Sequence, residues 1–381
     1  MQAGTIIVVV HTGDSRAIEK RTRMIHKPTM RRAAAVTTIF VVWLSAGVVA
    51  TAAQGRVVAT AAQGGDVAAA TAARPPAAIW RMVFARPSQI PSPVYNPLTR
   101  EKAVLGKHLF SDTRLSGDQQ RSCATCHDPR ANFVDNRPRA LGRDGHSLPR
   151  NTPQLWNLAW AKRLFWDGRA TSLEDQARFP IVHKNELGGD LVRIATLLNA
   201  DKAMKHHFDR VFLKQKRATP IVILKALASY QRTLVSPPTR FDNWIAGKTA
   251  KNTTLNNREY AGFRLFVGRG GCLACHGGWR FTDDRFHDIG LKTSDLGRNG
   301  LPPATLGMTV RTTPSHKTPS LRNIAHTAPY MHDGSLPTLE DIVAHYVTKR
   351  IARPSLAPQL RRRITLSKTE QVNLIAFLKT L

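Results

Sequence analysis

The sequence predicts a mainly α-helical protein in which one domain design is used twice. The pattern Gly-x-x-Leu-Phe occurs at 106–110 and again at 262–266, each time in a helix-like stretch and each time ahead of a Cys-x-x-Cys-His motif. Each half also ends on apolar residues at helical spacing, at 220–235 and 367–381. A glycine in the first helix of each half would let the closing helix cross it closely. With 381 residues, the chain is long enough for two such domains.

Residues 1–53 are predicted to be an N-terminal extension and a signal peptide. After Met30 come Arg31 and Arg32, an apolar run, and small residues near 50–53 that suit signal peptidase. Met24 and Met30 are both candidate start positions. The apolar run is marginal for a bilayer crossing, so we expect cleavage, export to the periplasm and no stable membrane span afterwards.

The next segment, residues 54–88, is predicted to be a low-complexity linker. It is rich in Ala, Gly and Val, and "VVATAAQG" at 48–55 recurs at 57–64. We expect the N-terminal domain at 89–248 and the C-terminal domain at 249–381. A Ser-x-x-Glu capping box at 367–370 opens the last helix.

The chain is strongly basic, with a formal net charge of +30. Such a charge favours anionic partners and speeds encounter with an acidic redox protein. Nucleic acid is the other common partner of a basic chain. We expect no nucleic-acid binding, because the chain has no recognisable nucleic-acid motif and is predicted to be exported.

Every cysteine belongs to a Cys-x-x-Cys-His motif. The motifs are Cys123, Cys126 and His127, and Cys272, Cys275 and His276. A disulfide framework would use scattered cysteines, and a zinc site would need ligands from both halves at once. The motif instead suits covalent c-type haem, in which two thiols form thioethers and the adjacent histidine ligates iron. The sequence therefore predicts two covalently bound c-type haems.

The sixth ligand of each iron decides between electron transfer and catalysis. Two strong axial ligands make an electron carrier, whereas an open position makes a reactive centre. Met204 is the one methionine between the first motif and residue 235, and it lies in a polar run. The histidine candidates are His146, His183, His206 and His207. His146, in a glycine-flanked loop, could swing toward the iron or remain in solvent.

Three residues between 163 and 189 suggest more than packing: Trp166, Gln176 and Glu186. Each also has an ordinary structural explanation, as a core aromatic, a solvated helix face and a surface carboxylate. The residues alone leave both explanations open.

Several stretches resemble the bacterial dihaem cytochrome c peroxidases and their MauG-like relatives. These are "LGKHLFSDTRLSGDQQRSCATCHDP", "LPRNTPQLWNLAW", "FWDGRATSLEDQ", the second haem motif and "TPSLRNIAHTAPYMHDGSLPTLEDIVAHY". The similarity runs in order over about 90–381. It implies two cytochrome c-like domains facing each other, each with one covalent haem. The N-terminal haem would be the peroxide site and the C-terminal haem the electron-transfer site.

The same resemblance implies roles for individual residues. Trp166 would be an electron bridge between the haems. Gln176 and Glu186 match the distal-pocket glutamine and glutamate, and Pro180 matches a pocket proline. A carboxylate above the iron can take a proton from peroxide and return it to the leaving oxygen.

Two departures from the conventional peroxidases concern axial ligands. Arg143 stands where peroxidases that need reductive activation carry a removable histidine, and His146 comes three residues later. We therefore expect the first haem to be open at rest, unless the loop shifts to deliver His146.

At the second haem, Tyr346 replaces the peroxidase methionine, as in MauG. Helical spacing from Leu339 turns Tyr346 inward, although a buried tyrosine with a satisfied hydroxyl would show the same pattern. Met331 and Met308 are the fallback ligands.

The resemblance also implies one calcium ion between the domains. Asn151, Thr327 and Pro329 match its ligand positions in the family, and amide and backbone oxygens suit this hard cation.

The favoured function is a periplasmic dihaem peroxidase that reduces hydrogen peroxide with electrons from a small redox protein, a cytochrome c or a cupredoxin. One alternative is a MauG-like enzyme that uses peroxide to oxidise a protein or a small molecule. Another is a non-catalytic dihaem electron carrier.

Overall fold

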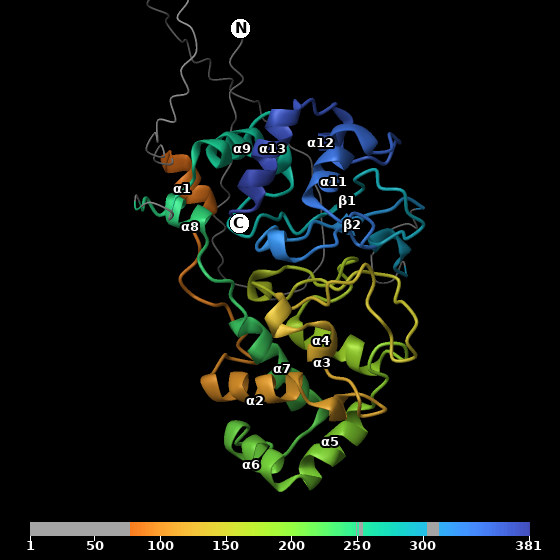
Figure 1. Ribbon diagram of the computed structural model, residues 1–381. Helices are drawn as coiled ribbons and strands as arrows, with labels where there is room; N and C mark the ends of the chain where they lie inside the picture. Colours follow the sequence, from red (N-terminus) through yellow and green to blue (C-terminus); the bar gives the residue numbers. More distant parts are fainter. Residues whose placement is uncertain (1–76, 249, 251–253, 303–311) are drawn as a thin grey trace, which may run out of the picture. The chain divides into compact units, whose positions relative to one another are not determined.

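A computed structural model describes residues 77–381 except 249, 251–253 and 303–311 (Figure 1). The predicted signal peptide, most of the predicted linker and the fallback ligand Met308 lie outside the described residues. Helices dominate, and the named strands are two residues each, paired antiparallel. The prediction of a mainly α-helical protein is confirmed.

The α-helices are α1 (Ala78–Phe84), α2 (Arg100–Phe110), α3 (Cys123–Cys126), α4 (Leu173–Val182), α5 (Leu191–Ala200), α6 (Lys202–Val211), α7 (Pro220–Thr233), α8 (Arg240–Ile245), α9 (Asn257–Val267), α11 (Leu339–Ala344), α12 (Pro358–Arg361) and α13 (Lys368–Leu378). The 3₁₀ turns are η1 (Thr113–Leu115), η2 (Pro129–Ala131), η3 (Leu158–Trp160), η4 (Cys272–Ala274), η5 (Arg298–Gly300) and η6 (Ile324–His326), and η7 (His345–Lys349) is a π-helical turn. The strands are β1 (Phe286–His287) and β2 (His316–Lys317).

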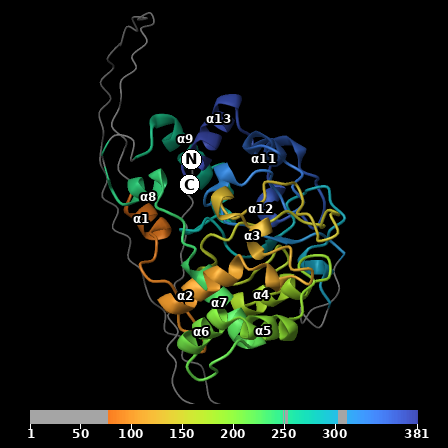
Figure 2. The ribbon, with the colours of Figure 1, turned by 60° about the horizontal axis from the view of Figure 1, so that its bottom comes forward.

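The first hydrophobic core lies among α2, α4, α5, α6 and α7, which Figures 1 and 2 show gathered in one lobe. Helix α2 begins at the cap Thr99, and α7 begins with Pro220 behind the cap Thr219. The two helices cross at Gly106. A Cβ there would collide with the carbonyl of Ala226, so the close crossing predicted for this glycine is confirmed.

The second core lies between α9 and α13 and repeats this construction. Capping boxes at Asn256–Glu259 and Ser367–Glu370 start the two helices. They cross at Gly262, where a Cβ would collide with the carbonyl of Asn373. Both halves therefore use a glycine to bring the first and last helices together.

Helices α1 and α8 belong to the second core, which departs from the predicted boundaries. Residues 78–84 fall in the predicted linker 54–88, yet they form α1, whose Phe84 is fully buried and stacks on Phe281. Phe241 and Trp244 of α8 fall in the predicted N-terminal domain, yet they also pack in the second core. The low-complexity composition ends before α1. This helix was not predicted because it has only seven residues and adjoins the low-complexity segment.

The described residues all belong to one compact unit. None of their helices has both the length and the hydropathy that a bilayer crossing requires.

A second repetition covers residues 155–184 and 321–350, which align without a gap. "LWNLAWAKRLFWDGRATSLEDQARFPIVHK" pairs with "LRNIAHTAPYMHDGSLPTLEDIVAHYVTKR". The two segments also share backbone features. Asn157 and Asn323 are left-handed, with φ of 62° and 58°, and isolated β-bridges join 164 to 170 and 330 to 336. Ser172 caps α4 and Thr338 caps α11 in the same way.

Candidate functional site

One cavity of about 880 Å³ connects the two Cys-x-x-Cys-His motifs. The cysteines and histidines of both motifs line it, together with Trp166, Gln176, Glu186 and Tyr346. Its size is near the upper end for sites that bind a cofactor or another small molecule. The structure therefore brings the predicted haem-attachment, catalytic and axial-ligand residues to one continuous space.

The motif histidines are held in the same way in both halves. Nδ1 of His127 lies 3.0 Å from the carbonyl oxygen of Phe133, and Nδ1 of His276 lies 2.9 Å from that of Phe281. Because a carbonyl can only accept, Nδ1 carries the proton in each ring and Nε2 keeps its lone pair for a metal. Burial lowers the pKa of both histidines, which keeps the imidazoles neutral.

The four thiols suit thioether formation better than zinc binding. Burial raises the pKa of Cys123 and Cys272 to about 12, and that of Cys126 and Cys275 to about 11. Zinc requires thiolates, and no group of potential metal ligands among the described residues joins the two motifs. Two buried thiols beside an oriented imidazole are the donor set that a covalent haem needs, so the residues fit one haem at each motif.

The wall of the cavity near the first motif carries an amide, an imidazole and a carboxylate side chain. Gln176 and Pro180 come from α4, while His183 and Glu186 come from the turn that follows it. Backbone hydrogen bonds from Leu187 to Pro180 and from Gly189 to Ile181 hold this turn against α4. Burial raises the pKa of Glu186, and Nδ1 of His183 lies 3.8 Å from its Oε1.

The other histidine candidates and Met204 are not in the cavity. His146 has a side chain that is 87% exposed and lies 3.4 Å from Asp144. Arg143 also lies outside the cavity, and its Nε is 3.9 Å from Oδ2 of Asp118. Met204 is buried in the first core, and His206 and His207 are exposed on α6. In this loop conformation neither His146 nor Arg143 lines the cavity, whereas His183 does.

Near the second motif the cavity wall is the helix that carries Tyr346. Helix α11 passes into the π-turn η7 at His345, and Ile342, Val343 and Tyr346 all line the cavity. Burial, with Cys272 and Cys275 nearby, raises the pKa of Tyr346. Single π-turns often occur at functional positions. Met331, the fallback ligand, lines the cavity with a left-handed φ of 73°.

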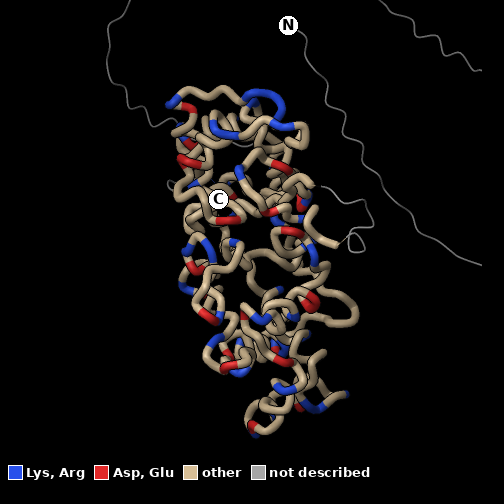
Figure 3. Tube along the Cα trace, turned by 90° about the vertical axis from the view of Figure 1, so that its right-hand side faces the viewer, with Lys and Arg blue, Asp and Glu red and all other residues tan. Residues whose placement is uncertain are grey.

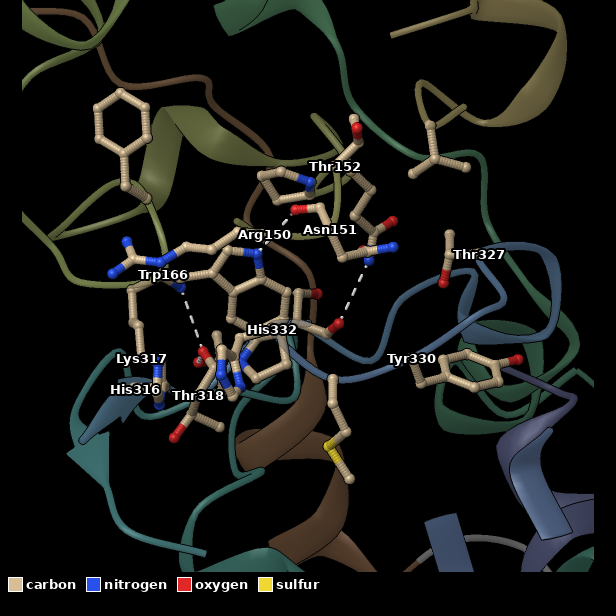
Figure 4. Close-up of a pocket in the computed structure, with 18 of the residues that line it drawn as sticks. Arg150, Asn151, Thr152, Trp166, His316, Lys317, Thr318, Thr327, Tyr330 and His332 are labelled. Carbon is tan, nitrogen blue, oxygen red and sulfur yellow. Dashed lines mark hydrogen bonds between the residues drawn. The ribbon is translucent and has the colours of Figure 1, made fainter. Parts of the chain in front are cut away.

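Trp166 lies on the wall that both motifs share (Figure 4). Its Nε1–H donates to the carbonyl of Asn151 at 3.0 Å, and its own carbonyl accepts from the amide of Lys317 at 2.7 Å. These bonds tie the tryptophan to segments from both halves of the chain. The three residues predicted for calcium, Asn151, Thr327 and Pro329, line the same cavity.

A cluster of histidine, arginine and aspartate side chains beside Trp166 was not predicted from the sequence. The rings of His316 and His332 stack at 3.7 Å, and His332 also meets the edge of Trp166 at 6.5 Å (Figure 4). Arg150 donates to both carboxylate oxygens of Asp295, at 2.7 and 3.0 Å. Burial, together with His316, lowers the pKa of His332 to about 4. Burial alone would raise the pKa of Asp295, but His316, whose Nε2 lies 3.5 Å from its Oδ2, and the hydrogen bonds from Arg150 hold the pKa below its usual range.

This cluster contains two histidines and one carboxylate, yet it is poorly arranged for a metal. The ring planes are nearly parallel, at 20°, so their in-plane lone pairs point side by side instead of converging. The guanidinium of Arg150 also neutralises the carboxylate of Asp295.

The internal repetition supplies the sequence signal that points to His332. At the shared offset, Trp166 pairs with His332, Phe165 with Met331, and Pro180 with Tyr346. His332 thus occupies in the second half the position of Trp166 in the first. Pro180, which has no atom that can ligate iron, occupies the position of Tyr346.

Comparisons with known proteins show the family to which the chain belongs. A family model described as di-haem cytochrome c peroxidase matches residues 100–250. The methylamine utilization protein MauG of Methylophilus methylotrophus is 42% identical over 307 residues, which cover 79% of this chain and 88% of that protein. The cytochrome c551 peroxidase of Nitrosomonas europaea is 34% identical over 295 residues, covering 76% and 83%.

A solved structure of a MauG-like protein associated with microbial copper homeostasis is also similar. Its TM-score is 0.67 at 31% identity, and the match covers 78% of this chain and 95% of that one. The fold, the donor sets at both motifs and these relatives lead to the same conclusion. The chain belongs to the family of dihaem cytochrome c peroxidases and MauG proteins, whose members carry c-type haem, and it is a peroxide-dependent oxidoreductase.

Proposed function

We propose that the protein reduces hydrogen peroxide at the first motif and receives the electrons through the second. The observation that carries this assignment is the asymmetry of one cavity. Glu186 and Gln176 line it near the first motif, whereas Tyr346 lines it near the second. The two cytochrome c-like halves, one haem in each, would face each other across this space.

The haem, when bound, supplies the iron that exchanges electrons with peroxide. Glu186 performs the proton transfer: its carboxylate takes the proton from one peroxide oxygen and returns it to the other as the O–O bond breaks. Two electrons and two protons then convert one hydrogen peroxide to two waters. The raised pKa of Glu186 brings it closer to neutral pH, where a group can both accept and return a proton efficiently.

Gln176 orients the substrate, and Trp166 links the two motifs. The amide of Gln176 can donate to peroxide while Glu186 accepts from it. Trp166 is held by backbone groups of Asn151 and Lys317, so its ring keeps a fixed place between the halves. A fixed aromatic ring between two redox centres shortens each electron step.

A MauG-like activity is the second candidate, and Tyr346 is the observation that favours it. In this alternative the oxidising power of peroxide passes to another protein or a small molecule. The 42% identity to MauG supports it as well. The electron source then becomes the substrate instead of a small redox protein such as a cytochrome c or cupredoxin.

The proposal also includes one bound calcium ion and a periplasmic location. Asn151 uses its Nδ2 on the carbonyls of Arg137 and Pro138, at 2.9 and 3.3 Å, which leaves Oδ1 for a cation. Thr327 and Pro329 would add oxygens from the opposite segment. The sequence of residues 30–53 supports export to the periplasm.

The test is peroxide turnover by the purified holoprotein, with and without a reduced small redox protein. Rapid, donor-dependent consumption supports the peroxidase, and slow consumption coupled to oxidation of an added protein supports the MauG-like activity. A holoprotein whose spectrum does not respond to peroxide in either oxidation state would instead be a simple electron carrier.

A further inference from the structure

The C-terminal segment that walls the second half of the cavity is unusually basic. Between Asp341 and Glu370 the chain contains no acidic residue. Its lysines and arginines are Lys349, Arg350, Arg353, Arg361, Arg362, Arg363 and Lys368. In Figure 3, blue segments gather at the upper end, the end that carries α12 and α13 in Figure 1. We call residues 349–363 the basic segment.

Three adjacent arginines of the basic segment lack a carboxylate partner among the described residues, although the guanidinium of Arg361 donates to the backbone carbonyls of Leu356 and Pro354. Arg361, Arg362 and Arg363 are exposed, and they form no ion pair with the other described residues. Arg353 differs, because it is bonded to the buried Asp288 at 2.7 Å. The arginine triplet therefore presents uncompensated positive charge to solvent.

The same segment faces the cavity on its other side. Gln359, Leu360 and Ile364 line the cavity, so the arginine triplet covers the outside of the wall whose inside borders the second site. Arg350 ties this wall to the site: it donates to the carbonyl of Tyr346 and, at 2.7 Å, to that of Arg362. Ile351, 40% exposed, adds an apolar spot among the charges.

We infer that the basic segment is the docking surface for a small acidic redox protein that exchanges electrons with the second haem. This rests on the proposed function, which makes that haem the point where electrons arrive. An apolar spot within a charged rim allows brief, specific contact, and the rim speeds the encounter of oppositely charged partners. A partner bound here would be separated from Tyr346 and His276 by the basic segment, which forms the wall of the cavity.

The test compares two triple charge reversals in the full-length holoprotein. One is Arg361→Glu with Arg362→Glu and Arg363→Glu. The matched control is Lys214→Glu with Lys216→Glu and Arg217→Glu, three exposed cations between α6 and α7 in the other lobe that also lack ion pairs with described residues. Thermal unfolding and the haem spectrum verify that both variants fold.

The probes are a purified acidic plastocyanin and a basic mitochondrial cytochrome c. Their binding is measured at ionic strengths of about 0.01 M and about 0.15 M, where the Debye length is about 30 Å and about 8 Å. Wild type should bind plastocyanin at low salt, more weakly at high salt, and prefer it to cytochrome c. The arginine reversal should weaken plastocyanin binding at low salt by about tenfold or more and flatten its salt dependence, while the control changes it by less than about twofold.

Peroxide-driven oxidation of hydroquinone, an uncharged reductant, separates a failure of the proposed function from a failure of the docking proposal. Its rate reports on the proposed function by itself. The ratio of plastocyanin oxidation to hydroquinone oxidation reports on docking, and it should fall in the arginine reversal alone. Three results would overturn the docking proposal. In the first, the wild type does not bind plastocyanin, and in the second, both triple reversals weaken plastocyanin binding equally. In the third, the arginine reversal weakens binding to anionic phosphatidylglycerol vesicles but leaves plastocyanin binding unchanged.

Discussion

Helices α4 and α11 occupy corresponding places in the two halves, and the segments that contain them differ at the position of Tyr346, the predicted axial ligand. "TSLEDQARFP" at 171–180 pairs with "PTLEDIVAHY" at 337–346. Both helices begin at a hydroxyl cap and both line the cavity. The tenth residues of these two stretches differ: the first has Pro180, whose side chain has no ligating atom, and the second has Tyr346.

The residues around these positions differ in the same direction. The first half adds His183 and Glu186, which can hold or move a proton, and Gln176, whose amide can donate and accept hydrogen bonds. The second half has Ile342 at the position of Gln176, and the pKa of Tyr346 is raised. In the proposed function, one repeated scaffold would therefore support a reactive site in the first half and an electron-transfer site in the second.

The largest effect is expected from Glu186→Gln, which removes the proton acceptor from the reactive half. The rate of peroxide consumption should fall by about 10²- to 10⁴-fold, because the amide cannot accept the proton. Both haems should stay attached. The exposed carboxylate of Glu101, changed to Gln, is the control, and unchanged peroxide kinetics in Glu186→Gln would remove the residue from the mechanism.

The wild-type rate should also depend on pH through Glu186. Since burial raises the pKa of this carboxyl, the deprotonated base is lost at a higher pH than for an ordinary glutamate. The acid limb of the pH–rate profile should therefore lie above the usual glutamate range and disappear in Glu186→Gln.

Pro180→Tyr makes the first half resemble the second. If the identity of this residue distinguishes the halves, a tyrosine here should slow peroxide consumption by at least about tenfold and shift the first haem toward low spin. Pro180→Ala removes the proline without adding a ligand and should retain most of the rate. Equal behaviour of the two variants would show that the proline itself is what matters.

Trp166→Phe tests the connection between the halves. It keeps an aromatic ring but loses the hydrogen bond to Asn151, so turnover with a protein donor should slow by about tenfold. The reaction of the first haem with a single equivalent of peroxide should be retained. Trp160→Phe is the matched control, because Trp160 packs on Trp279 and does not line the cavity. A donor-dependent rate equal to that of wild type would exclude the bridge.

The smallest effect is expected from His183→Ala. His183 lowers the pKa of Glu186 through its charge, so its loss should move the acid limb to higher pH and reduce the rate near neutrality by roughly twofold. His206→Ala, on the exposed face of α6, should leave the profile in place. A wild-type profile in His183→Ala would make this pair incidental.

Much of the architecture could be predicted from the sequence because its signals are local. The helical spacing of 367–381, its capping box and the glycines at 106 and 262 all lie within single helices, and the structure agrees with each. Helix α1 was missed because seven residues are too few to show a period, and Phe84 is buried only by its partners in the second core.

The residues of the candidate site that belong to recognisable sequence stretches could be predicted. Glu186, Gln176 and Tyr346 were predicted from the family resemblance, and the structure brings them to one cavity. Their roles are still predictions. Asp295, His316 and Arg150 could not be predicted, since they meet only through long-range folding. The offset between 155–184 and 321–350 is the sequence signal that would have pointed to His332.

The electron paramagnetic resonance spectrum of the ferric holoprotein, before and after one equivalent of hydrogen peroxide, tests the central asymmetry most directly. We expect one high-spin haem and one low-spin haem, with the high-spin signal lost on peroxide addition and the low-spin signal altered in Tyr346→Met. Two low-spin haems that do not respond to peroxide, in either oxidation state, would contradict it.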